Sequence, residues 1–158
     1  MKTLKILMLC LAVSTLTFNC SSDDDSSTPT PDNSLMLSDL EGSWIAISIT
    51  QTNNANTSES FELVANGAEL RYTMLPGGAT RTWIDFGEFQ DEWDAQGSLS
   101  GNILTMTPAE ANRGVKVYTV NKESNVITLT NSNDEFDFTL SGESPVSATS
   151  VTVLIPNN

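Results

Sequence analysis

The chain has 158 residues, with 20 acidic side chains against 7 basic ones and a formal net charge of −13. Phosphate backbones repel so acidic a chain, and we therefore expect no nucleic-acid partner. The sequence contains no histidine, which removes the commonest general base and the usual zinc ligands, so we predict a non-catalytic protein without metal or cofactor.

The first 19 residues have the layout of a secretory signal. Lys2 and Lys5 precede an apolar run over residues 6–16, and Cys20 follows a short polar stretch. A cysteine at the cleavage point predicts a bacterial lipoprotein that is acylated on Cys20. Two alternatives stay open: ordinary signal cleavage, and a spanning anchor, which requires about 20 apolar residues.

Residues 20–34 are expected to form a disordered tether between the lipid and the domain. After Cys20 they comprise only Ser, Thr, Pro, Asp and Asn, a composition that cannot bury enough apolar surface to fold. The run Ser21-Ser22-Asp23-Asp24-Asp25 resembles the acidic tract of lipoproteins of the Bacteroidetes, which implies an outer-membrane protein displayed on the cell surface. Because anionic headgroups repel an acidic domain, the acyl chains would supply the membrane attachment.

Residues 35–158 are predicted to form one domain that begins with a helical turn. The apolar stretch 35–40 has Ser38 and Glu41 at the spacing of a capping box. Alternating patterns and turn residues then predict strands over 43–51, 61–65, 68–75, 80–86, 88–96, 103–107, 115–120, 126–130, 136–140 and 151–155. Asn66-Gly67 between two such runs predicts a tight hairpin. Nine or ten strands at this spacing indicate an all-β sandwich or barrel.

The segment Leu40-Glu41-Gly42-Ser43-Trp44, at the start of the first strand, resembles the lipocalin group of β-barrels. The stretches 101–106 and 125–130 are similar to hairpin strands of small bacterial lipocalin-like lipoproteins. The resemblance implies an antiparallel up-and-down β-barrel of about eight strands. A related small all-β group that also begins with Gly-x-Trp, and an immunoglobulin-like sandwich, are the alternatives.

In that resemblance Gly42 allows a tight turn and Trp44 plugs the closed end of the barrel. An arginine usually packs across this tryptophan, and here either Arg113 supplies it or the contact is absent. Trp44 is out of phase with Ile45, Ile47 and Ile49, which share one face by alternation. Either a bulge follows Trp44, or Trp44 faces away from the isoleucines.

The candidate ligand-binding side chains are aromatic residues and a scarce arginine: Tyr72, Arg81, Trp83, Trp93 and Tyr118. Each could instead pack in the core or on the outer wall. The acidic residues Asp85, Glu88, Asp91, Glu92 and Asp94 could form a calcium site or a hydrolytic carboxylate pair, but a solvated strand face is the simpler interpretation. Asp134, Glu135 and Asp137 form a weaker acidic group.

The function expected from these features is the binding of a small apolar or glycan-derived ligand by a surface lipoprotein. The alternatives are a surface module whose loops contact a protein or polysaccharide and, less favoured, a carboxylate-dependent hydrolase. Inward-facing residues decide whether the interior has room for a ligand. The sequence does not predict the oligomeric state.

Overall fold

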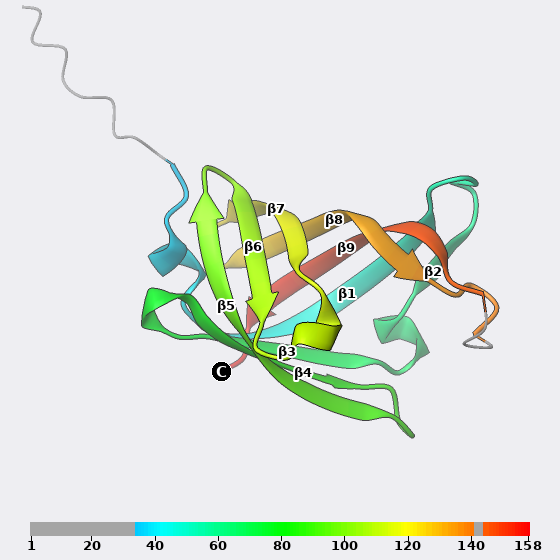
Figure 1. The fold of residues 1–158 in the computed structure, drawn as a ribbon, viewed down its shortest axis with the longest axis horizontal. Coiled ribbons are helices and arrows are strands. Elements are labelled where there is room, and N and C mark those ends of the chain that lie inside the picture. The colour runs from blue at the N-terminus through cyan, green and yellow to red at the C-terminus, as the bar shows by residue number, and fades with distance from the viewer. Residues whose placement is uncertain (1–33, 141–143) are drawn as a thin grey trace, which may run out of the picture. The chain divides into compact units, whose positions relative to one another are not determined.

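The computed structural model describes residues 34–140 and 144–158, which form one nine-stranded antiparallel sheet closed on itself (Figure 1). The predicted signal, the lipidated Cys20 and all of the tether except Ser34 lie outside the described residues. No helix in the described ranges is long and apolar enough to span a membrane. The strands are β1 (Gly42–Asn53), β2 (Ser60–Glu62), β3 (Glu69–Met74), β4 (Ala79–Asp85), β5 (Gln90–Ser100), β6 (Ile103–Pro108), β7 (Lys116–Glu123), β8 (Val126–Phe136) and β9 (Val146–Pro156), with 3-10 turns η1 (Leu37–Leu40), η2 (Val64–Asn66), η3 (Pro76–Gly78) and η4 (Ala111–Arg113).

The first and last strands pair with each other, which closes the barrel. From β3 to β9 each strand pairs with the next along the chain, and β1 pairs with both β3 and β9. The contact of β1 with β9 is long, from Trp44 opposite Pro156 to Asn53 opposite Ala148. Because β2 pairs with β1 alone, the other eight strands form the closed ring. The eight-stranded up-and-down barrel is therefore confirmed, and the two-sheet sandwich is wrong.

A bulge in β1 reverses which residues face the interior. The register against β9 shifts between Ala46 and Ser48, so Trp44 and Ala46 are buried before it and Ile49 after it. Ile47, at the bulge, is 52% exposed. The prediction that the three isoleucines share one face is wrong, whereas the alternative of a bulge after Trp44 is correct.

The predicted hairpin at Asn66-Gly67 does not form, because β2 pairs with β1 instead of β3. The carboxylate of Glu62 accepts hydrogen bonds from the backbone amides of Ile49, at 2.7 Å, and Ala65. These bonds fasten the chain to the bulged part of β1, so it continues into η2 rather than into a two-residue turn. Burial works to raise the pKa of Glu62, but the amide hydrogen bonds outweigh it and lower the pKa.

Two other predicted strand limits differ from the structure. β5 continues through Gly97, which we expected to end it, and 136–140 is not a separate strand because Phe136 ends β8. The backbones of Gly97 and Gly78 in η3 lie close together. A Cβ on Gly78 would come within 2.3 Å of the Gly97 carbonyl oxygen, so this approach leaves no room for a side chain on Gly78.

The helical turn η1 covers one end of the barrel, and Trp44 packs beneath it. The indole Nε1 of Trp44 donates to the Leu40 carbonyl at 2.9 Å, and Leu40 is 2% exposed. Gly42 has φ +129°, in the region that favours glycine. The capping carboxylate is Asp39, which accepts from the Met36 amide, so the predicted pairing of Ser38 with Glu41 is wrong.

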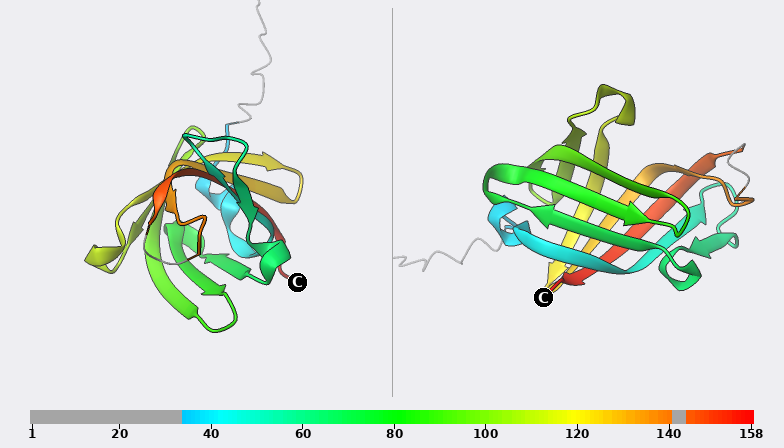
Figure 2. Two further views of the ribbon diagram at one scale, coloured as in Figure 1. Left: turned by 90° about the vertical axis from the view of Figure 1, so that its right-hand side faces the viewer. Right: turned by 90° about the horizontal axis from the view of Figure 1, so that it is seen from below.

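Little space remains at this covered end. A void of about 20 Å³ lies among Leu40, Trp44 and the apolar side chains around them, which is close to the minimum for one water molecule. Figure 2 (left) looks from the opposite end, with η1 behind the ring of strands. Trp44 therefore fills its end of the barrel as the family resemblance implied.

Candidate functional site

The other half of the barrel contains a cavity of about 300 Å³. The side chains that line it come from the five strands β3 to β7 and from η4. They form an aromatic and apolar wall with a charged rim: Tyr72, Thr82, Ile84, Asp91, Trp93, Ala95, Met106, Pro108, Arg113, Lys116 and Tyr118. The interior is thus filled at the η1 end and hollow at the other.

Strand register brings three of the lining residues side by side. Tyr72 on β3 is opposite Thr82 on β4, which in turn is opposite Trp93 on β5. Alternation within each strand points these side chains to the same inner face. Tyr72 and Met106 line both the cavity and the small void near η1, so they form the floor that separates the two.

Tyr72 and Tyr118 both line the cavity, and each phenol influences the pKa of the other. Burial raises the pKa of both phenols, and the nearby Tyr72 and Asp134 raise that of Tyr118 further. Both side chains therefore remain neutral hydroxyl groups at physiological pH. Thr82 is fully buried, and its hydroxyl has no hydrogen-bond partner among the described residues.

Arg113, at the end of η4, clamps the β6–β7 connection onto β5. Its guanidinium binds the Asp91 carboxylate in bidentate geometry at 2.6 and 2.8 Å, and its Nε donates to Glu110 at 2.7 Å. The same guanidinium lies 4.9 Å from the centre of the Trp93 ring, within cation–π range. The hydrogen bonds from Arg113 lower the pKa of Asp91, and those to Asp91 and Glu110 raise the pKa of Arg113.

Arg113 therefore contacts Trp93 rather than Trp44, so of the two alternatives the absence of an arginine across Trp44 agrees with the described residues. Trp44 already has its partner in the Leu40 carbonyl. A cation does contact η1 itself: Lys122 Nζ donates to the Asp39 carbonyl at 2.5 Å.

Lys116 on β7 supplies the second cation of the cavity and is also paired. Its Nζ lies 2.8 Å from Asp134 Oδ1. A register shift in β8 between Asn131 and Asp134 turns this carboxylate toward the interior, where it also accepts a long contact from Gln51 Nε2 at 3.5 Å. Gln51 donates in turn to Ser150 at 3.2 Å, so a polar band crosses the barrel beside the cavity.

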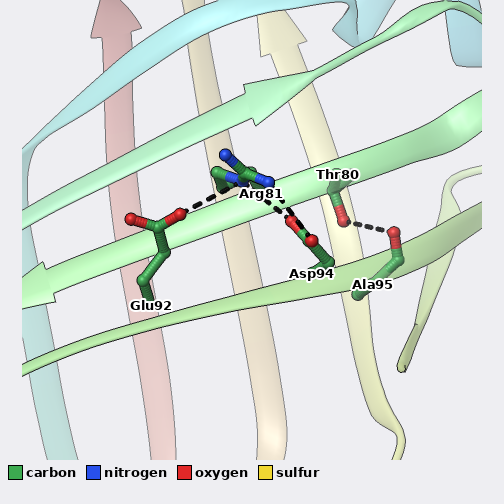
Figure 3. A network of polar contacts seen from close by, with 5 residues as sticks. All are labelled: Thr80, Arg81, Glu92, Asp94 and Ala95. Carbon is green, nitrogen blue, oxygen red and sulfur yellow. Dashed lines mark hydrogen bonds and ion pairs between the residues drawn. The ribbon is translucent and has the colours of Figure 1, made fainter. Parts of the chain in front are cut away.

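The structure separates the five predicted ligand-binding residues into two groups. Tyr72, Trp93 and Tyr118 line the cavity. Arg81 and Trp83 alternate with the inward residues of β4 and are not among the lining residues. Arg81 binds Asp94 at 2.9 Å and Glu92 at 3.2 Å across β4 and β5, as Figure 3 shows, while the Arg71 guanidinium lies 4.8 Å from the Trp83 ring.

The acidic segment of β5 is divided between the two faces of the sheet. Asp91 faces the cavity, whereas Glu92 and Asp94 pair with Arg81. Asp85 accepts from the Gly87 amide and the Gln90 side chain at the β4–β5 turn. Within the described residues, no three Asp, Glu, Cys or His side chains gather closely enough to hold a metal ion.

Sequence reasoning did not select Thr82, Asp91, Arg113 and Lys116 as members of one cavity. Thr82 had a usable signal, since alternation places it on the face opposite Arg81 and Trp83. Arg113 had none, because it lies in a connection whose position depends on the ion pair it makes. Comparisons of the chain with protein-family models, curated proteins and solved structures find no match.

Proposed function

We propose that this protein is a lipid-anchored surface protein that binds one small ligand in the cavity without chemical conversion. The observation that carries the proposal is the division of the barrel into a filled end and a cavity of about 300 Å³ with three aromatic walls. Ligand pockets in proteins start at about this volume and combine apolar walls with a few polar groups. Cys20 would attach the protein to the outer membrane through its acyl chains.

Binding without catalysis is favoured by the carboxylates of the site. Asp91 is the one carboxylate among the described residues that line the cavity. Arg113 lowers its pKa, whereas a general acid working near neutral pH needs a raised one. A pair of carboxylates of the kind that glycosidases use is not present among those lining residues.

The test is to fill the cavity and follow a ligand that co-purifies from the native host. Ala95→Leu places a larger side chain inside the cavity, and Ala79→Leu makes the same change on the exposed face of β4. Native mass spectrometry should show a bound small molecule on the parent and on Ala79→Leu but not on Ala95→Leu. Retention by folded Ala95→Leu, or no small molecule on the parent, would contradict the proposal.

A second candidate function, contact with another macromolecule, rests on the β4–β5 turn. Phe86 and Phe89 are 41% and 57% exposed there, with ring centres 6.3 Å apart. Exposed aromatic pairs of this kind are typical of interaction surfaces. A stable protein partner in the same mass spectra, lost on replacing both phenylalanines with serine, would favour this function.

A further inference from the structure

We infer that the ligand is a neutral ring molecule that carries at least one hydroxyl group. The inference rests on the proposed function, since it concerns the same cavity. Three properties of the lining residues lead to it: compensated charges, unused hydroxyl groups, and limited depth.

The charged groups of the cavity are already paired with one another. Arg113 has Asp91 and Glu110 as partners, and Lys116 has Asp134 at 2.8 Å. An anionic ligand would have to displace one of these carboxylates, and would approach a protein of net charge −13. A cationic ligand would lie beside Arg113 and Lys116. Because neither an anionic nor a cationic ligand would meet an unpaired opposite charge in the cavity, a neutral ligand is favoured.

The hydroxyl groups of the cavity, by contrast, are incompletely paired. Tyr72 and Tyr118 line the cavity, and each phenol carries one O–H donor that a ligand oxygen can accept. Thr82 lies directly opposite Tyr72 in the sheet, and its buried hydroxyl has no partner among the described residues. An apolar ligand would leave these groups unpaired in a dry site, which is unfavourable. A ligand oxygen at the floor would pair with them.

The depth and walls of the cavity favour a ring over a long chain. Tyr72 and Met106 close the floor, and the void beyond them holds only about 20 Å³, so an extended acyl chain has no room to continue. Trp93, Ile84 and Pro108 offer flat or rigid apolar surface above the floor. Such surfaces suit the faces of aromatic rings and of sugars.

The inference is tested with four probes that share one ring and differ in a single group: phenol, toluene, benzoate and benzylammonium at pH 7. Methyl β-glucopyranoside is added to distinguish a sugar from an aromatic alcohol. Binding to the parent, Tyr72→Phe and Thr82→Val is followed through the NMR signals of the Met106, Ala95 and Ile84 methyl groups. Both substitutions retain side-chain shape and remove one hydroxyl, and thermal unfolding checks that each variant folds.

Phenol, the glucoside or both should bind at least ten times more tightly than toluene, benzoate and benzylammonium. Tyr72→Phe, Thr82→Val or both should weaken that binding about tenfold, the factor that corresponds to one hydrogen bond, and leave the toluene affinity unchanged. Thr82→Val should unfold at the same temperature as the parent or higher, because it removes a hydroxyl that no described protein group pairs.

The inference is overturned if toluene or either charged probe binds as tightly as the hydroxylated ones, or if both variants bind phenol and the glucoside as the parent does. In those cases Ala95→Leu still blocks the bound probe, and the proposed function survives. If no probe shifts any of the three methyl signals, the cavity binds nothing of this size and both the inference and the proposed function fail.

Discussion

The filled end of the barrel depends on Trp44, and its replacement by phenylalanine tests this directly. Trp44 is 8% exposed, and its indole donates at 2.9 Å to the Leu40 carbonyl. Phenylalanine leaves that buried carbonyl without this donor, which costs about 1–3 kcal/mol. It also leaves a small void, so the total for Trp44→Phe is about 2–4 kcal/mol, below the roughly 3–5 kcal/mol typical of Trp→Ala in a core.

The matched control is Trp83→Phe, because Trp83 lies on the outside of β4 and contacts the Arg71 guanidinium at 4.8 Å. Loss of part of an exposed cation–π contact costs roughly 1 kcal/mol or less. Urea unfolding followed by far-ultraviolet circular dichroism gives both free energies of unfolding. The reasoning is refuted if Trp44→Phe unfolds within about 0.5 kcal/mol of the Trp83→Phe variant, since surface substitutions fall in that range.

Three further predictions concern the η3 turn, the rim of the cavity and the membrane anchor. Gly77 and Gly78 both have positive φ, but only a Cβ on Gly78 clashes with the backbone of β5. Gly78→Ala should therefore lower the free energy of unfolding by about 1–3 kcal/mol more than Gly77→Ala does. Equal losses of the two variants in urea titrations would exclude the clash. Arg113 lowers the pKa of Asp91. This ion pair therefore stabilises the fold at pH values above the ordinary aspartate pKa of about 3.9, and the stabilisation is lost as the pH falls through the lower folded-state pKa. Carboxyl-carbon NMR should show a higher Asp91 pKa in Arg113→Gln, and an unchanged pKa would contradict the assignment. Cys20→Ala should release the protein from the membrane fraction of its host, and a variant that sediments with membranes as the parent does would exclude the lipid anchor.

The fold was predictable because most of its signals are local and periodic. Alternation within 80–86 assigns Thr82 and Ile84 to one face and Trp83 to the other, and the structure has this arrangement. The Gly-x-Trp segment likewise placed a buried tryptophan at the start of the first strand. Turn residues divided most of the remaining strands, but β8 continues to Phe136 and β9 begins at Val146, several positions beyond the predicted limits, and 136–140 is not a separate strand.

The hairpin at Asn66-Gly67 was wrong because a distant partner outweighed a local preference. Two-residue turns of this composition favour a hairpin when the flanking strands pair with each other. Here the Glu62 carboxylate binds the Ile49 amide thirteen residues away, and β2 pairs with β1. The sequence of the segment 60–68 contains no signal for this contact, because the Ile49 amide that Glu62 binds lies in the bulged part of β1.

The candidate site was predictable only in part because bulges reverse inward and outward positions along a strand. Register shifts after Ala46 and after Asn131 place Gln51 and Asp134 on the inner face, and a strict period of two fails at each shift. Aromatic residues were easier to select, because Tyr72 and Trp93 were candidates by residue type alone. Their grouping in one cavity required the strand register.

The cavity exists where the barrel wall is incomplete, which explains why its rim is charged. Residues 90–94 of β5 pair with β4, whereas the pairing of β5 with β6 begins only at Ala95. Arg113, from the β6–β7 connection, covers this uncovered stretch by binding Asp91 and stacking on Trp93. A bidentate ion pair combined with a cation–π contact fixes the orientation of the connection against the strand as well as its distance. The same three side chains therefore complete the wall and line the site, so changes that loosen the connection will also change what the cavity binds.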